Sequence, residues 1–172
     1  GVPGDFKYKQ NEDWAIDMRR LMSFLHATQQ DILDTYVGRT PLERAIPERI
    51  SKDIETFGII KVLRKGIKVE NIALKLWYPK PSPADAKENM LLFQQNQFSV
   101  TRQQTYSRLK PGDEIDMVLY VNGLPIFTFE WKNPWTYQTA RYNGQKQYKE
   151  DRSPKDKLLN FGRCLAHFTG DK

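Results

Sequence analysis

The chain has 172 residues, 39% of them hydrophobic and 28% charged, so it is long enough to bury the core of one domain. Its formal net charge of +6 makes polyanions plausible partners, and with a mean hydropathy of −0.69 it has no apolar run long enough to cross a membrane. The lone cysteine, Cys164, excludes an internal disulfide and a cysteine-clustered zinc site. We expect a globular domain that works in the cytoplasm.

The amino-terminal third has the hydrophobic period of helices. Apolar residues at helical spacing predict a helix over residues 13–36. A second helix is predicted over residues 42–57, with a fresh helix start at Pro47. Residues 59–66 form a short apolar segment that fits either a strand or a helix.

From about residue 69 the pattern changes to that of strands. Four strands are predicted, over residues 69–78, 97–106, 114–121 and 124–132. The last two flank Asn122-Gly123, which is a strong hairpin signal. Two helices are predicted at the end, over residues 139–152 and 155–168. This order of elements predicts a mixed α/β domain.

Residues suited to metal-dependent chemistry gather at the end of the second hairpin strand. Strand alternation places Glu130 and Lys132 side by side on one face, and Asp116 lies on the partner strand. Two carboxylates and a lysine can hold a hard divalent cation and orient a water against a phosphate. The opposite face, which we expect to pack against a helix, carries Phe127, Phe129 and Trp131.

The register of the hairpin decides whether Asp116 and Glu130 share a face. A strict two-residue turn sets Asp116 opposite Phe129, whereas a loop of odd length or a bulge sets it opposite Glu130. Pro125 cannot donate a ladder hydrogen bond, which favours an irregular connection. We therefore predict an odd-length loop. Spacing alone leaves open that Glu130 and Lys132 belong to an ordinary solvated face.

The segment IDMVLYVNGLPIFTFEWKNP (115–134) resembles the PD-(D/E)xK nuclease motif in the R (restriction and motor) subunit of type I restriction enzymes. Further similar stretches occur in order at FLHATQ (24–29), VLRKGIK (62–68), SVTRQQTYS (99–107), QYKEDRSP (147–154) and NFGRCLAHF (160–168). The resemblance thus covers nearly the whole chain. It implies a single nuclease domain over 1–172, with a helical extension at about 1–40 and a restriction-endonuclease-like α/β core at about 41–172. That core is a mixed, largely antiparallel central sheet flanked by helices.

The resemblance also implies a catalytic set. Asp116 and Glu130 correspond to the metal-binding acidic residues of the motif, and Lys132 to its lysine. A further acidic residue is expected from a preceding helix, for which Glu48 is the best match. The possible substitutes for Glu48 are Glu43, Asp53 and Glu55.

The helix predicted over residues 139–152 is expected to support the site and contact DNA. In the family this helix often carries glutamine four residues before tyrosine; here Tyr148 is present, but Gly144 holds the glutamine position. The glutamines near that spacing are Gln138, Gln145 and Gln147, and which of them faces the site stays open. The remaining expected DNA-contacting or supporting residues are Lys149, Arg152 and, from a strand, Arg102.

The implied function is Mg²⁺-dependent cleavage of double-stranded DNA, without sequence readout by this domain. The implied partners are the specificity and modification subunits of a type I restriction-modification enzyme. The chain has no GxxxxGK[ST] phosphate loop, so ATP is expected to bind only in a motor downstream of residue 172. The alternative is a catalytically inactive DNA-binding or subunit-docking module of the same fold.

Overall fold

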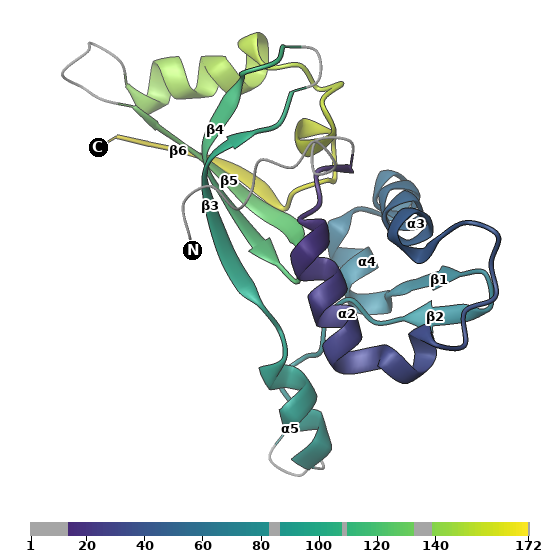
Figure 1. The fold of residues 1–172 in the computed structure, drawn as a ribbon. Coiled ribbons are helices and arrows are strands. Elements are labelled where there is room, and N and C mark those ends of the chain that lie inside the picture. The colour runs from purple at the N-terminus through teal and green to yellow at the C-terminus, as the bar shows by residue number, and fades with distance from the viewer. Residues whose placement is uncertain (1–13, 83–86, 108–109, 133–138, 172) are drawn as a thin grey trace.

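The computed structural model describes residues 14–82, 87–107, 110–132 and 139–171. They form an α/β fold with a four-stranded mixed sheet, flanking helices and a small two-stranded antiparallel sheet (Figure 1). Within these residues, every helix is too short or too polar to cross a lipid bilayer.

The amino-terminal half packs helices against the small sheet. Its elements are α2 (Met18–Leu33), α3 (Leu42–Phe57), α4 (Ile59–Lys65), β1 (Ile67–Val69) and β2 (Ile72–Leu74). Their apolar residues form one core that includes Leu21, Phe24, Ile46, Ile50 and Leu74. The core sits between the helices because each helix turns one apolar stripe inward.

Three predictions for this half are settled by the structure. The helices predicted over residues 13–36 and 42–57 are present, but α3 runs through Pro47 without the predicted fresh start. The ambiguous segment 59–66 is the helix α4. The strand predicted over residues 69–78 is wrong, because β1 and β2 form a tight hairpin in which Glu70 adopts a φ of 47°.

The larger sheet has the strand order β3-β4-β5-β6. Its strands are β3 (Phe98–Thr105), β4 (Glu114–Val121), β5 (Leu124–Lys132) and β6 (Ala166–Asp171). The first three are antiparallel, and β6 runs parallel to β5. The predicted largely antiparallel sheet flanked by helices is therefore confirmed.

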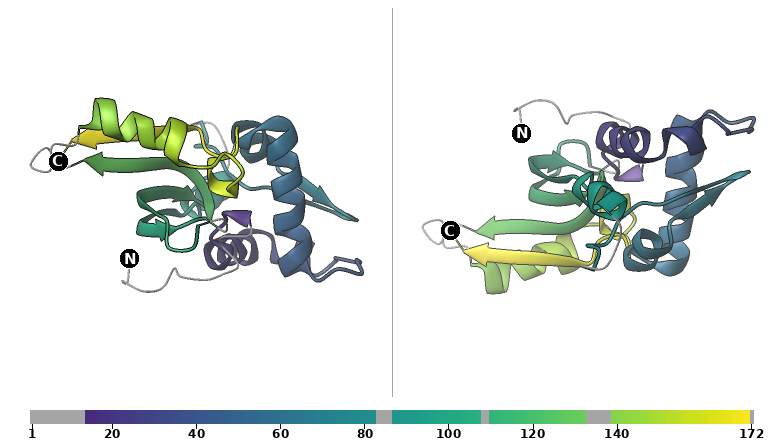
Figure 2. Two further views of the ribbon diagram at one scale, coloured as in Figure 1. Left: turned by 90° about the horizontal axis from the view of Figure 1, so that it is seen from above. Right: turned by 90° about the horizontal axis from the view of Figure 1, so that it is seen from below.

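Short helical elements complete this half. They are α5 (Lys87–Gln94), the π-helical segments η2 (Ala140–Gly144) and η3 (Gln147–Asp151), and the 3-10 segment η4 (Lys157–Leu159). The two π-helical segments confirm the helical prediction for 139–152 and lie along one face of the sheet beside β5 and β6 (Figure 2). They thereby cover the face that carries the candidate site.

A bulge sets the register of the β4–β5 hairpin, and the predicted odd-length loop does not. Val121 pairs with Leu124 across a two-residue turn, so the predicted odd-length loop is wrong. A bulge then shifts the register, because Tyr120 pairs with Pro125 while the preceding Leu119 pairs with Phe127. Proline cannot donate to the ladder, which explains why the extra residue is accommodated directly after it.

The predicted helix over residues 155–168 is wrong. Leu158 and Cys164 are buried, but Phe161 and Leu165 are exposed, so the apolar residues do not form one helical stripe. Gly162 adopts a φ of 77°, which interrupts a right-handed helix. The chain then enters β6, which supplies the edge strand that the sequence left unassigned.

The apolar side chains of β5 also lie differently from the prediction. Phe127 packs against the main core, whereas Phe129 and Trp131 form ring contacts within the sheet. The Phe129 ring instead stacks on Trp131 at 6.2 Å and 11°, and on Phe168 of β6 at 5.1 Å and 18°. Trp131 and Phe168 both remain partly exposed.

Candidate functional site

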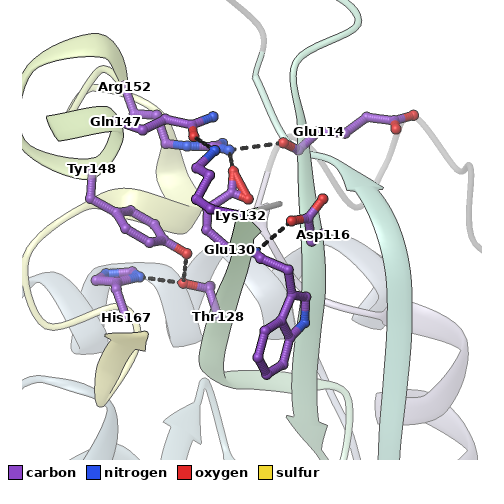
Figure 3. A network of polar contacts seen from close by, with 10 residues as sticks. Glu114, Asp116, Thr128, Glu130, Lys132, Gln147, Tyr148, Arg152 and His167 are labelled. Carbon is purple, nitrogen blue, oxygen red and sulfur yellow. Dashed lines mark hydrogen bonds and ion pairs between the residues drawn. The ribbon is translucent and has the colours of Figure 1, made fainter. Parts of the chain in front are cut away.

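The hairpin brings Asp116, Glu130 and Lys132 to the same end of the sheet (Figure 3). Met117 pairs with Phe129 after the bulge, so the next position along the ladder sets Asp116 opposite Glu130. The Asp116 carboxylate turns toward β5, where its Oδ2 accepts a hydrogen bond from the backbone N of Trp131 at 2.7 Å. The two acidic residues therefore lie on neighbouring strands, in the register that the bulge sets.

Glu130 is buried, and its charge is balanced by a buried arginine. Arg152 Nη2 donates to Glu130 Oε1, and the two side chains are 4% and 3% exposed. The same Nη2 donates to the backbone carbonyl of Glu114 at 3.0 Å. The guanidinium lies over the rings of Tyr106 and Tyr148, 5.0 and 5.6 Å from their centroids. Arg152 was expected to contact DNA or to support the site, and the structure places it against a candidate metal ligand.

Lys132 is held by a glutamine of the covering helix, the name used here for the π-helical segments η2 and η3 together. Its Nζ donates to Oε1 of Gln147, which lies on η3 (Figure 3). Of the three glutamines left open by the sequence, Gln147 is the one that contacts the lysine, whereas Gln145 is exposed. Gln138 lies outside the described residues.

Below Glu130 on the same face, a polar chain ties β5 to β6 and to the helix. Thr128 Oγ1 lies 2.8 Å from the hydroxyl of Tyr148 and 2.6 Å from Nδ1 of His167. Burial raises the pKa of Tyr148 to about 12, so its hydroxyl stays protonated at neutral pH. Burial, and then the charge of Arg152, lower the pKa of His167, so its ring favours the neutral form.

Thr128 and His167 were not among the predicted site residues. The alternation that predicted Glu130 and Lys132 on one face also places Thr128 there, two residues earlier, so a local signal existed. His167 pairs with Thr128 only through the parallel β6, and no local pattern predicts that strand.

Glu48 lies elsewhere. It is an exposed residue of α3 whose Oε1 accepts from Arg44 Nε at 2.7 Å. The α3 helix lies at the opposite end of the molecule from the carboxyl ends of β5 and β6 (Figure 2). Of the substitutes on this helix, Asp53 pairs with Arg49 at 2.9 Å and Glu55 pairs with Lys157, while Glu43 is exposed. The structure thus does not bring an acidic residue of α3 to the hairpin end.

A cavity of about 460 Å³ opens beside Asp116. It is lined by Arg102, Gln103, Asp116, Met117, Trp131 and Asp171. Arg102 is exposed there, as are Lys146 and Lys149 on the covering helix. An anionic ligand approaching this end of the sheet would meet these positive charges.

Asp116 and Glu130 together suit a hard divalent cation that takes only one or two of its ligands from the protein. Among the described residues there is no group of three or more acidic, histidine or cysteine side chains that could hold a metal. Mg²⁺ commonly takes one or two carboxylates and completes its shell with water and phosphate oxygens, a role that Asp116 and Glu130 can fill. The buried Glu130 carboxylate already has a cation beside it, the guanidinium of Arg152.

Comparison with known families agrees with the resemblance found in the sequence. The sequence profile of the type I restriction enzyme R protein N terminus matches residues 28–171. Neither a curated protein nor a solved structure matches the chain significantly. The profile begins within α2 and runs through the β4–β5 hairpin to the end of β6, and thus covers most of the described fold. The chain therefore belongs to the family of type I restriction enzyme R protein N-terminal regions.

Proposed function

We propose that this chain is a Mg²⁺-dependent endonuclease domain that hydrolyses phosphodiester bonds of double-stranded DNA, built on a restriction-endonuclease-like core. The observation that carries the proposal is the convergence of Asp116, Glu130 and Lys132 at one end of the β4–β5 hairpin. That convergence occurs in a chain of a restriction-enzyme family.

Each residue has a distinct proposed role. Asp116 and Glu130 hold the metal, which when bound supplies Lewis-acid activation of water and of the scissile phosphate. Lys132 places its ammonium group beside the carboxylates, where it stabilises negative charge that develops on the phosphate. Gln147 fixes the position of that ammonium group through its hydrogen bond. The catalytic role expected for Glu48 has no support from its contacts on α3.

The proposed DNA contacts are electrostatic. Arg102 at the cavity and Lys149 on the covering helix are exposed, and the chain carries a net charge of +6. Such charges bind phosphates without reading bases, so the isolated chain should bind DNA weakly, independently of sequence and less tightly as salt rises. A sharp preference for one short duplex in a competition assay would contradict this part of the proposal.

The proposed setting is a cytoplasmic type I restriction-modification complex. Within it, separate subunits read the sequence and methylate it, and an ATP-dependent motor continues the R subunit beyond this domain. The support for this setting is the family membership.

The test is cleavage of plasmid DNA by the complete restriction complex, in Mg²⁺ and in EDTA. Asp116→Asn, Glu130→Gln and Lys132→Ala should each reduce cleavage by about 100-fold or more, while ATP hydrolysis persists. Glu114→Gln is the matched control. Glu114 is a carboxylate two residues before Asp116, but only its backbone carbonyl joins the network, and its side chain points away (Figure 3). Full cleavage by Asp116→Asn, or metal-independent cleavage, would refute the proposal.

A second candidate is a catalytically inactive DNA-binding or subunit-docking module. The observation that favours it is the ion pair of Glu130 with Arg152, since a carboxylate neutralised in this way is not free to bind metal. Unchanged cleavage, DNA binding and complex assembly in the Lys132→Ala variant would support this second candidate.

A further inference from the structure

The ion pair between Arg152 and Glu130 occupies the carboxylate on which the proposed metal site depends. Both side chains are almost fully buried, and Arg152 Nη2 bridges Glu130 Oε1 and the carbonyl oxygen of Glu114. A carboxylate buried to this degree is stable in its charged form only with a partner cation beside it. In the structure that partner is the guanidinium.

A divalent cation and a guanidinium cannot both lie against this carboxylate without repelling each other. The repulsion is strong here because the site is buried, where the effective dielectric constant is far below that of water. Binding of a divalent cation to Glu130 therefore requires Arg152 to move away. The free energy needed to move Arg152 therefore lowers the affinity of the site for the metal.

Contacts other than the one with Glu130 also hold the guanidinium of Arg152. It already rests over the rings of Tyr106 and Tyr148, whose faces attract a cation. Its Nε is buried and has no hydrogen-bond partner among the residues that the structure describes. Arg152 also directly follows η3, where the backbone has left the helix with a φ of −95° and a ψ of 135°. The side chain is thus anchored to Glu130 mainly through one nitrogen, Nη2.

We propose that Arg152 is the resident counter-ion of Glu130 in the metal-free protein and is displaced from it when a divalent cation binds. This inference rests on the proposed function, because it takes Glu130 to be a metal ligand. Arg152 is then a positioning residue: it keeps the buried carboxylate charged and oriented until the metal arrives. It also sets the metal affinity, since every binding event must first break the ion pair.

The first test measures Mn²⁺ binding by electron paramagnetic resonance in the 172-residue chain, without DNA. Arg152→Gln removes the competing cation and should tighten Mn²⁺ binding at least tenfold. A purely structural role of Arg152 would predict weaker binding, because the site would be disordered. Equal or weaker Mn²⁺ affinity in Arg152→Gln than in the wild type would overturn the inference.

Arg163→Gln is the matched control for loss of a buried arginine. Arg163 is 1% exposed and its Nη2 donates to Ser51 Oγ at 3.2 Å, away from Glu130. This variant should lose stability but keep the wild-type Mn²⁺ affinity. A similar tightening in both arginine variants would also overturn the inference, because it would show a non-specific loosening of the fold.

The second test titrates the wild-type protein with Mg²⁺ and does not depend on the folding of Arg152→Gln. The Nε–H resonance of Arg152, assigned by its absence in Arg152→Lys, should shift along the Mg²⁺ titration with the same midpoint as metal binding. Metal binding with an unchanged resonance would overturn this inference while leaving the nuclease proposal intact. Absence of metal binding in both the wild type and Arg152→Gln would overturn both proposals together.

Discussion

Gln103 of β3 stands across the ladder from Asp116 of β4 and adopts a left-handed backbone conformation, with a φ of 50°. The flanking pairs, Arg102 with Met117 and Gln104 with Ile115, are regular. A residue other than glycine in this conformation is strained, and such strain is characteristic of functional sites. Gln103 and Asp116 also line the same cavity, so the strained residue borders the candidate metal site.

Replacing Gln103 tests this strain. Gln103→Gly should be about 1 kcal/mol more stable to urea than Gln103→Ala, because glycine adopts a positive φ without the clash of a Cβ atom. In an ordinary extended strand the order would be reversed, since glycine there is the less stable residue. An alanine variant as stable as the glycine variant would show that Gln103 does not hold this conformation in solution.

The buried ion pair predicts strong energetic coupling between Arg152 and Glu130. Arg152→Gln leaves the buried Glu130 carboxylate unpaired and should lower the free energy of unfolding by about 3–5 kcal/mol in metal-free buffer. The double variant with Glu130→Gln should lose much less than the sum of the single variants, because neither charge then remains buried alone.

A second double-mutant cycle provides the comparison. Arg44 and Glu48 form an ion pair at 2.7 Å on α3, but both side chains are exposed to solvent. Water and salt screen such a pair, so its coupling should be far smaller. Equal coupling in the two cycles, measured by urea unfolding, would contradict the burial of the Arg152–Glu130 pair.

His167 predicts a pH dependence of stability. Burial and the charge of Arg152 lower its pKa in the folded protein below the ordinary value of 6.5. As the pH falls below 6.5, the unfolded chain takes up a proton at this residue before the folded protein does, so stability falls with pH. Above 6.5 the ring is neutral in both states, and this residue adds no slope.

His167→Asn isolates this contribution, because the asparagine amide can replace the imidazole nitrogen that contacts Thr128. Urea unfolding at pH 8 and pH 5 should show a larger loss of stability in the wild type than in the variant. An identical loss in both proteins would mean that His167 titrates at its ordinary pKa when folded.

Local patterns in the sequence were sufficient for most of the fold. The helical periods gave α2 and α3, and strand alternation with Asn122-Gly123 gave the β4–β5 hairpin. The edge strand β6 was missed because it is made by parallel pairing with β5, a contact between distant segments that leaves no local period. The predicted helix over residues 155–168 instead included the first residues of this strand.

The site shows the same division between local and distant contacts. Glu130 and Lys132 share a face by alternation alone, which the sequence contains. The position of Asp116 depended on a bulge whose location only the structure gives. The burial of Arg152 against Glu130 depends on how the π-helical segments pack on the sheet, so the sequence left open whether Arg152 contacts DNA or supports the site.

The turn of the hairpin yields a final prediction, because it is docked on the start of α2. Gly123 has a φ of 80°, and its carbonyl oxygen accepts from the backbone N of Asp17 at 2.8 Å. A Cβ atom at this position would lie 2.4 Å from the Asp17 carbonyl oxygen and 2.7 Å from the Leu21 nitrogen, both of them backbone atoms. A side chain there therefore strains the turn and also pushes the hairpin off the helix.

Gly112 separates these two effects. It also has a positive φ, of 101°, but a Cβ atom there meets no atom of the described residues within 4 Å. Gly112→Ala should therefore lose only the backbone strain, about 1–2 kcal/mol. Gly123→Ala should lose at least about 2 kcal/mol more, because the clash with α2 involves backbone atoms that cannot rotate away. Urea unfolding of both variants measures the difference, and equal losses would show that the hairpin turn does not rest on α2.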